Sequence, residues 1–288
     1  MKKNSIIKKL VKTGIAAAVL ACVVSFAPEH AFAKEAITKS NFDYSWYIAK
    51  HQDLAAIMSA DDKDAIWEFY ESTGEPNGWY GRPSMESYIT STNMDYDTFL
   101  AQNQDVYALY GNDYDKVYKW YKKYGVKEGR TAQTTNDEIN TRINMYTMAG
   151  TIFTDGMSDR EKIKAVHDWI INNTSYDQGL SDESYSFAGV IKNKKGVCQG
   201  YSETFEAFMD IAGIECEIVR GTATNSRGST GAHAWNKVKV DGNWLYIDVT
   251  WDDPVCSTGK NILRYDYFLI SEDKMNANHT AYANPIVR

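Results

Sequence analysis

A cysteine, a histidine and an aspartate in the C-terminal half of the chain have the side chains needed to break an amide bond. Cys198 lies in the stretch GVCQGY, His233 in HAWN and Asp248 in DVTWDDP. A thiolate attacks the carbonyl carbon, an imidazole takes up the thiol proton, and a carboxylate fixes the tautomer of the imidazole. This chemistry requires that the folded elements bring the three groups together.

A buried helix is predicted directly after Cys198, because apolar residues recur there at helical spacing and Gly213 follows the last of them. The apolar positions are Tyr201, Phe205, Phe208, Met209 and Ala212. Cys198 therefore stands at the N-terminus of the helix. The positive end of the helix dipole favours a thiolate there, and backbone N–H groups could hold an oxyanion. A buried, unreactive cysteine would fit the same position.

His233 and Asp248 lie on two predicted strands that flank Asp241-Gly242, a strong hairpin signal. With a two-residue loop, the register puts Asp248 opposite Trp235. His233 and Asp248 then share one face as diagonal neighbours, with Cβ atoms about 7 Å apart. A three-residue loop with a bulge would separate them, and Asn236 lies on the wrong face to orient the histidine. Taken singly, each residue also fits a structural role.

A second histidine, His167, lies on a helix predicted from about Ser158 to Asn172. The helix begins with a capping box, in which Ser158 is followed three residues later by Glu161. Nothing in the neighbouring sequence marks His167, so we expect an ordinary, partly exposed histidine.

The first 33 residues have the pattern of an export signal. A lysine-rich start is followed by an apolar run from Gly14 to Ala27 and by the small residues Ala31 and Ala33. We expect cleavage after Ala33 and a secreted or cell-surface protein. The apolar run is short for a membrane span. Lipid attachment at Cys22 is a weaker alternative.

Charge and cysteine content limit the function classes. Removal of residues 1–33 takes away five lysines and one glutamate, so the formal charge falls from −7 to −11. A chain this acidic is a poor candidate for nucleic-acid binding. Cys216 and Cys256 could form a disulfide, although two free thiols are favoured. No cysteine pair has zinc-site spacing and no calcium-binding loop is present, so we expect no metal and no cofactor.

Two segments near the N-terminus resemble each other, Phe42–Gly78 and Met94–Gly129, at an offset of about 50 residues. Such a period indicates duplicated helical units. Gly74 and Gly125 are predicted to be helix C-terminal caps. The segments resemble the aromatic repeats of exported bacterial proteins that end in G-x-x-E-G-R, which the second copy matches and the first does not. The aromatics could bind cell-surface glycan, but their helical spacing favours a role in the core.

From about Ser158 to Phe268 the chain resembles the bacterial transglutaminase-like superfamily. The matching motifs are GVCQGY, Gly213-Ile214, HAWN and DVTWDDP, and the later YFLIS stretch and His279 resemble the ending of this group. The resemblance implies that Cys198 is the nucleophile, His233 the base and Asp248 the orienting acid. It also implies an α+β, papain-like core, in which the cysteine helix packs on an antiparallel sheet.

These observations predict a chain made of a signal peptide (1–33), an all-α repeat region (34–130), a linker (131–136) and a catalytic domain (137–288). The resemblance implies thiol acyl chemistry on a protein or peptide amide, with hydrolysis favoured over transamidation to a lysine. Gln199, Tyr176 and Trp235 are candidates for the oxyanion donor or the substrate groove. A non-catalytic cell-surface binding or scaffolding protein stays a possible alternative, and the oligomeric state is not predicted.

Overall fold

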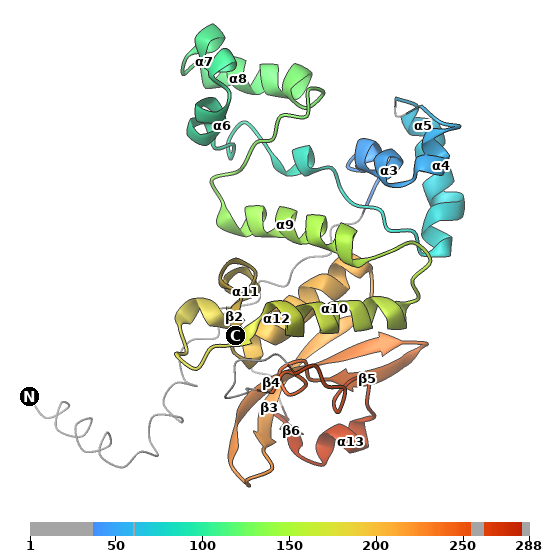
Figure 1. The fold of residues 1–288 in the computed structure, drawn as a ribbon, viewed down its shortest axis with the longest axis vertical. Helices are drawn as coiled ribbons and strands as arrows, with labels where there is room; N and C mark the ends of the chain where they lie inside the picture. Colours follow the sequence, from blue (N-terminus) through green and yellow to red (C-terminus); the bar gives the residue numbers. More distant parts are fainter. Residues whose placement is uncertain (1–36, 60, 255–261, 284–288) are drawn as a thin grey trace, which may run out of the picture. The chain divides into compact units, whose positions relative to one another are not determined.

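The computed structural model describes residues 37–59, 61–254 and 262–283 (Figure 1). The chain divides into two compact units, one from Glu35 to Val166 and one from His167 onward. This division does not test the functional boundaries at 34–130, 131–136 and 137–288, which stay predictions. The expected signal peptide, Cys22 and Cys256 lie outside the described residues. Within the described ranges, no helix is long and apolar enough to cross a bilayer.

The two similar N-terminal segments form the same succession of elements. The first contains α3 (Tyr44–Lys50), α4 (Gln52–Ala55), α5 (Lys63–Phe69) and the π-helical turn η3 (Tyr70–Gly74). The second contains α6 (Tyr96–Gln102), α7 (Gln104–Tyr110), α8 (Tyr114–Trp120) and the π-helical turn η6 (Tyr121–Gly125). The short 3₁₀ helices η4 (Glu75–Asn77) and η5 (Met85–Tyr88) and the longer α9 (Asp137–Ile152) complete this helical region.

Aspartates at equivalent positions begin the helices of both segments. The carboxylates of Asp43 and Asp95 accept hydrogen bonds from backbone N–H groups in the first turns of α3 and α6. Asp62 and Asp113 cap α5 and α8 in the same way. Each cap satisfies a donor that the helix itself leaves unpaired. Each segment also has its own aromatic and aliphatic core, so the helical spacing that the two segments share reflects packing.

Gly74 and Gly125 are not the C-terminal caps that the sequence predicted. Gly74 has a helical φ of −63° and ends the π-helical turn η3, and Gly125 occupies the same place in η6. The left-handed residues are Gly78 and Gly129, four positions later. A Cβ on Gly74 would lie 2.4 Å from the Tyr47 hydroxyl. Close packing of an aromatic side chain therefore explains that glycine.

The arginine that follows the second segment, Arg130, corresponds to a tryptophan, Trp79, after the first segment. Arg130 donates to Asn103 Oδ1 at 3.0 Å and to both carboxylate oxygens of Asp105 at 2.7 Å. At the equivalent positions of the first segment, Trp79 stacks on His51 with ring centroids 4.5 Å apart. A ring stack thus occupies the place of the ion pair, which explains how the first copy departs from the G-x-x-E-G-R pattern.

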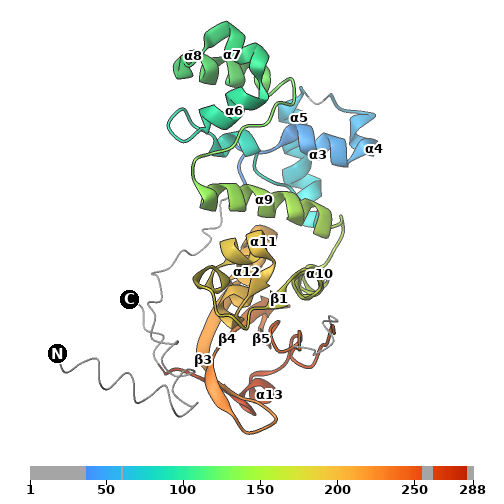
Figure 2. The same ribbon diagram turned by 60° about the vertical axis from the view of Figure 1, so that its left-hand side comes forward.

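The C-terminal unit is built on a four-stranded antiparallel sheet in the order β5-β4-β3-β6, of which Figure 2 labels β3, β4 and β5. The strands are β3 (Cys216–Thr224), β4 (Thr230–Val240), β5 (Asn243–Ile247) and β6 (His279–Ala281). Its helices are η7 (Asp182–Tyr185), α11 (Phe187–Asn193), α12 (Cys198–Ala212) and α13 (Glu272–Asn276), and the second half of α10 (Asp159–Asn173) also belongs to it. A short parallel pair, β1 (Ser175–Tyr176) and β2 (Lys195–Gly196), precedes α12.

Helix α12 packs on β4 and β3 and carries Cys198 as its first residue. Gly213 ends the helix in the left-handed conformation, as predicted. The predicted α+β class is confirmed, with a cysteine-bearing helix against an antiparallel sheet and a helical N-terminal region. Cys216, at the start of β3, has a free thiol.

The predicted hairpin register is also correct. Asp241 and Gly242 both have positive φ, 54° and 76°, as a two-residue type I′ turn requires. Val240 pairs with Asn243, and the ladder runs as far as the pair Asn236 and Ile247. Asp248 follows directly after this last pair, so the register brings its side chain to the face of β4 that carries His233.

Strand β6 approaches β3 closely because residue 221 is a glycine. A Cβ on Gly221 would lie 2.1 Å from the Thr280 carbonyl oxygen and 2.8 Å from the Trp235 ring. Both distances are shorter than any ordinary carbon contact. The missing side chain therefore lets β6 bring His279 against the middle of the sheet.

We expect Gly221→Ala to lower the free energy of unfolding by about 1–3 kcal/mol, the usual cost of overpacking. Gly231→Ala is the matched control, because Gly231 lies on the partner strand and an added Cβ would meet nothing within 4 Å. Urea unfolding of the two variants measures the difference. Equal stabilities for the two would contradict the close approach of β6.

Candidate active site

Backbone contacts on two sides hold Cys198 at the start of α12. The preceding residue, Val197, donates its N–H to the Ser184 carbonyl at 3.0 Å and accepts from the Tyr201 N–H at 3.0 Å. A Cβ on Gly200 would lie 2.3 Å from the same Ser184 oxygen, so the segment around Ser184 packs tightly on the first turn. The Cys198 side chain is partly exposed. It is therefore accessible to a substrate while lying at the positive end of a 15-residue helix.

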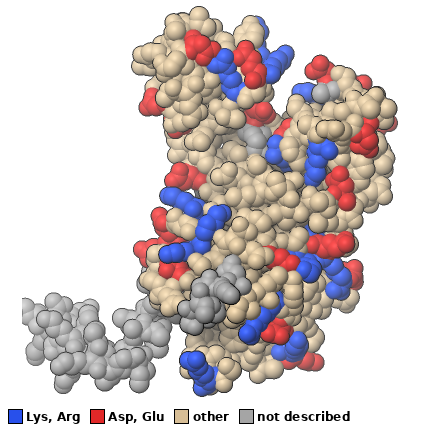
Figure 3. Space-filling model, in the orientation of Figure 1, with Lys and Arg blue, Asp and Glu red and all other residues tan. Residues whose placement is uncertain are grey.

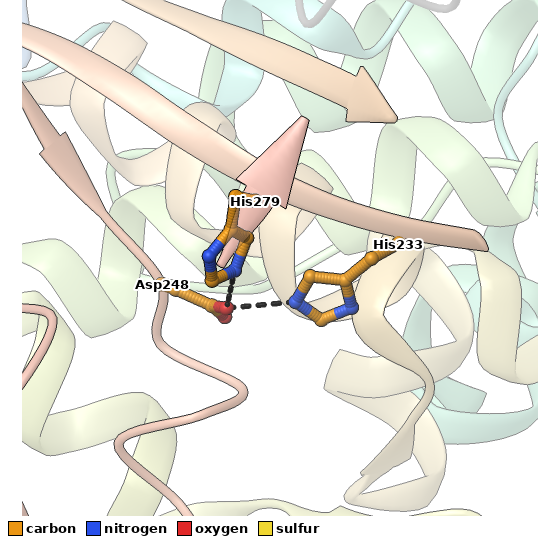
Figure 4. Close-up of side chains that lie close together, drawn as sticks. All are labelled: His233, Asp248 and His279. Atoms are coloured by element: carbon orange, nitrogen blue, oxygen red, sulfur yellow. Dashed lines mark hydrogen bonds and ion pairs between the residues drawn. The ribbon is translucent and has the colours of Figure 1, made fainter. Parts of the chain in front are cut away.

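His233 points one ring nitrogen at Asp248. Its Nε2 lies 2.7 Å from Asp248 Oδ2, as Figure 4 shows. An ionised carboxylate can only accept, so Nε2 carries the proton and donates it to this contact. The other nitrogen, Nδ1, then remains for Cys198, whose side chain helps to raise the pKa of His233. Nδ1 is therefore the nitrogen that can exchange a proton with the thiol.

Burial and charge act in opposite directions on His233. Burial disfavours the imidazolium, but the Asp248 charge, the hydrogen bond to Asp248 and the Cys198 side chain outweigh it and raise the pKa of His233 to about 10. For Asp248, burial favours the neutral acid, yet His233 and His279 lower its pKa to about 2. The pair is therefore held as imidazolium and carboxylate in a largely water-free place.

Asp248 is fully buried and both of its carboxylate oxygens are occupied. Oδ1 accepts the Trp251 N–H at 3.1 Å, and Oδ2 faces His233 and also His279 Nε2 at 3.1 Å. The Asp248 backbone N–H donates to the Tyr267 carbonyl at 3.1 Å. Position and ionisation of the carboxylate are thus fixed together, because a buried charge needs this full set of donors.

The loop after Asp248 is anchored by two more buried carboxylates. Asp252 accepts the Tyr267 N–H at 3.0 Å and lies 3.2 Å from His167 Nε2. Asp253 accepts the Tyr201 hydroxyl at 2.6 Å, which joins the loop to the cysteine helix. The motif DVTWDDP therefore supplies one carboxylate to His233 and two to the elements around it.

The expectation that His167 is an ordinary, partly exposed histidine is wrong. The side chain is fully buried, and its two ring nitrogens contact Asp168 Oδ1 at 2.9 Å and Asp252 Oδ2 at 3.2 Å. Its main partner is distant in the sequence, so helical periodicity alone gave no sign of the contact. The signal in the sequence was the pair of adjacent acids in DVTWDDP, because a buried carboxylate needs a hydrogen-bond donor opposite it.

The three further candidates lie in different surroundings. Gln199 has its amide engaged, with Nε2 donating to Glu203 Oε1 at 2.8 Å and Oε1 accepting from Arg220 Nε at 3.3 Å. Tyr176 lies on β1, paired with Gly196 just before the cysteine helix.

The third candidate, Trp235, is 1% exposed and packs on His279 with ring centroids 4.9 Å apart. Its Nε1 has no hydrogen-bond partner among the described residues. Trp235 thus supports the histidines from inside the protein.

A metal ion could use the same three side chains that meet at Asp248. One ligand atom each of His233, Asp248 and His279 lie within 4.8 Å of one another. The two contacts to Asp248 Oδ2, at 2.7 and 3.1 Å, are the lengths of hydrogen bonds. Protons on the two Nε2 atoms therefore account for the arrangement.

The raised pKa of His233 predicts a pH-dependent stability. The pKa is about 10 in the folded protein and about 6.5 in an unfolded chain. A raised pKa stabilises the fold below pH 6.5, and this contribution is lost as the pH rises through 10. The stability advantage of the wild type over His233→Gln should therefore shrink between these values in urea unfolding. An advantage that stays constant would contradict the raised pKa.

Comparison with known proteins places this geometry in context. Residues 146–249 match the family model described as the transglutaminase-like superfamily, and this range contains Cys198, His233 and Asp248. The chain is 25% identical over 132 residues to kyphoscoliosis peptidase of Mus musculus, across 42% of this chain and 20% of that protein. The chain thus spans about a fifth of the length of this relative.

Two solved structures also align with part of the chain. A protein from Cytophaga hutchinsonii, provisionally described as a cysteine protease, is 18% identical with a TM-score of 0.33, over 50% of this chain and 47% of its own. A TGase is 22% identical with a TM-score of 0.34, over 52% of this chain and 41% of its own. The family match and the α12-on-sheet architecture together identify the C-terminal part of the chain as a transglutaminase-like α+β fold.

Proposed function

We propose that this protein is an exported thiol enzyme that hydrolyses peptide or side-chain amides through a thioester on Cys198. The observation that carries the proposal is the His233 imidazole, which is hydrogen-bonded through Nε2 to buried Asp248 and whose pKa is raised by the Cys198 side chain at the head of α12. This is the order of nucleophile, base and orienting acid that thiol acyl transfer requires. The basic and apolar pattern of residues 1–33 supports export.

The first half-reaction forms the thioester. The His233 imidazolium pairs with the Cys198 thiolate, and the sulfur attacks the amide carbon while N–H groups at the start of α12 face the oxygen that gains charge. The C–N bond breaks, and His233 Nδ1 returns its proton to the leaving amine. Asp248 stabilises the imidazolium throughout, since its carboxylate stays ionised at a pKa of about 2.

The second half-reaction decides between two outcomes. Water, activated by His233, attacks the thioester carbon, releases a carboxylic acid and restores the thiol. A lysine amine in place of water would give transamidation and a cross-link. We favour hydrolysis, because the relative with 25% identity carries the name of a peptidase.

The helical N-terminal region supports a second function, which is binding and not catalysis. Its second segment exposes Tyr107, Tyr114 and Tyr124, each at least 40% accessible. In Figure 3, basic and acidic side chains are interspersed over the visible face and do not gather in one basic patch. We propose that residues 34–130 contact cell-wall or surface glycan, and that nucleic acid is not a partner. A scaffolding protein without catalysis would have these features too, so the chemistry needs a direct test.

The test incubates the mature chain with casein and a fluorescent primary amine. We expect peptides to be released, no amine to be incorporated, and release to fall at least about 100-fold in Cys198→Ala and His233→Ala, in line with the usual loss of a nucleophile or base. Cys216→Ala is the matched control, because this free thiol lies at the start of β3 and should be dispensable.

Two results would change the assignment. Incorporation of the amine in place of peptide release would establish transamidation. Equal activity in the wild type and Cys198→Ala would refute a thiol enzyme and favour the binding or scaffolding alternative.

A further inference from the structure

A second buried histidine, His279, contacts the same oxygen of Asp248 as His233 does. His279 is 1% exposed and begins β6, the strand that Gly221 allows to approach. Its Nε2 lies 3.1 Å from Asp248 Oδ2. Figure 4 shows the two imidazoles reaching this oxygen from different directions, each from its own strand.

The neighbouring side chains determine which nitrogen of His279 carries a proton. His279 Nδ1 lies 2.7 Å from Asn278 Oδ1, and the other amide atom of Asn278 is 2.7 Å from the Tyr267 hydroxyl. With the amide in this orientation, both ring nitrogens of His279 must donate. With the amide turned over, Asn278 donates to Nδ1 and the ring is neutral. In both cases Nε2–H donates to Asp248, because the ionised carboxylate can only accept.

Aromatic rings enclose His279 and leave its imidazole little freedom to turn. Trp251, Trp235 and Tyr267 have ring centroids 4.5, 4.9 and 5.5 Å from that of His279. The ring is therefore fixed by packing on its faces and by hydrogen bonds at both nitrogens. A donor held this rigidly restricts where the Asp248 oxygen can lie.

We propose that His279 is a positioning residue, which fixes Asp248 Oδ2 through its Nε2–H so that this oxygen meets the His233 Nε2–H. Asn278, which also contacts the Tyr267 hydroxyl, fixes the His279 ring in turn. The inference rests on the proposed function, since it concerns the orientation of the same base. His279 does not touch the reacting atoms in this scheme and acts through Asp248 alone.

Loss of the His279 donor has a predictable effect on Asp248. Burial raises the pKa of this acid, and His233 and then His279 lower it again, so removal of one donor shifts the balance toward the neutral acid. The titratable groups that face the site are His233 from β4, Cys198 from α12 and Tyr267 from the segment before α13. A neutral or displaced Asp248 no longer holds His233 as the imidazolium that pairs with Cys198.

The experiment measures the rate at which iodoacetamide alkylates Cys198 as a function of pH, with the labelled residue identified by mass spectrometry. In the wild type we expect fast labelling below pH 7, and in His279→Ala a rate about 10-fold lower there, with the acid limb of the profile moved to higher pH. His279→Gln keeps an N–H donor at the position of Nε2 and should restore most of the rate. His51→Ala is the matched control, a buried histidine of the N-terminal unit.

The outcomes separate this inference from the proposed function. Wild-type labelling that follows an ordinary thiol, with a midpoint near pH 8.5, would refute the proposed function itself. Fast wild-type labelling with an unchanged profile in His279→Ala would overturn only the positioning role. Equal losses in His279→Ala and His279→Gln would also overturn it, because they would indicate packing and not the hydrogen bond.

A variant that fails to fold does not end the test. Tyr267→Phe removes only the hydroxyl that contacts Asn278 and should shift the labelling profile in the same direction by a smaller amount. Nitrogen-15 NMR of the wild-type imidazoles is a second readout that needs no variant. A protonated Nε2 on His279 at neutral pH is the expected result, and a bare Nε2 would overturn the proposal.

Discussion

A carboxylate without access to water governs the arrangement of the C-terminal unit. Asp248 is fully buried, and such a charge is tolerated only when donors surround it. The donors come from His233 on β4, His279 on β6 and the Trp251 backbone in the following loop. Two strands on different sides of β3 and one loop must therefore be in place before the charge is compensated. The same requirement that stabilises the fold fixes the orientation of the base.

The loop that carries Asp248 also joins the sheet to the helices. Asp253 accepts from Tyr201, one turn along the helix that begins with Cys198, and Asp252 contacts His167 on α10. The distance between the thiol and the imidazole therefore depends on hydrogen bonds on both sides of the loop. This connection is the structural reason that the motifs GVCQGY, HAWN and DVTWDDP meet in one site.

Local patterns predicted the elements of this site well. The apolar spacing after Cys198 and the glycine at 213 defined α12, and Asp241-Gly242 fixed a register that brings His233 and Asp248 to the same face. These features depend on neighbours in the sequence, where helical and strand periodicities are informative. The α+β architecture was expected from the family resemblance.

Contacts between distant segments were not predictable in the same way. The burial of His167 depends on Asp252, and the role of His279 depends on a close approach that Gly221 permits. The glycines Gly74 and Gly125 were misread as caps, because a glycine selected for tight packing and one selected for positive φ look alike in a sequence. Periodicity reports which side of an element is buried, and it does not report which partner lies there.

The most direct test of the account is an NMR titration of the His233 imidazole in the wild type and in Asp248→Asn. We expect the wild-type ring to stay protonated through neutral pH and to titrate near pH 10, and Asp248→Asn to move the titration to lower pH. A wild-type His233 that titrates near the ordinary value of about 6.5 would contradict the claim that buried Asp248 controls the base.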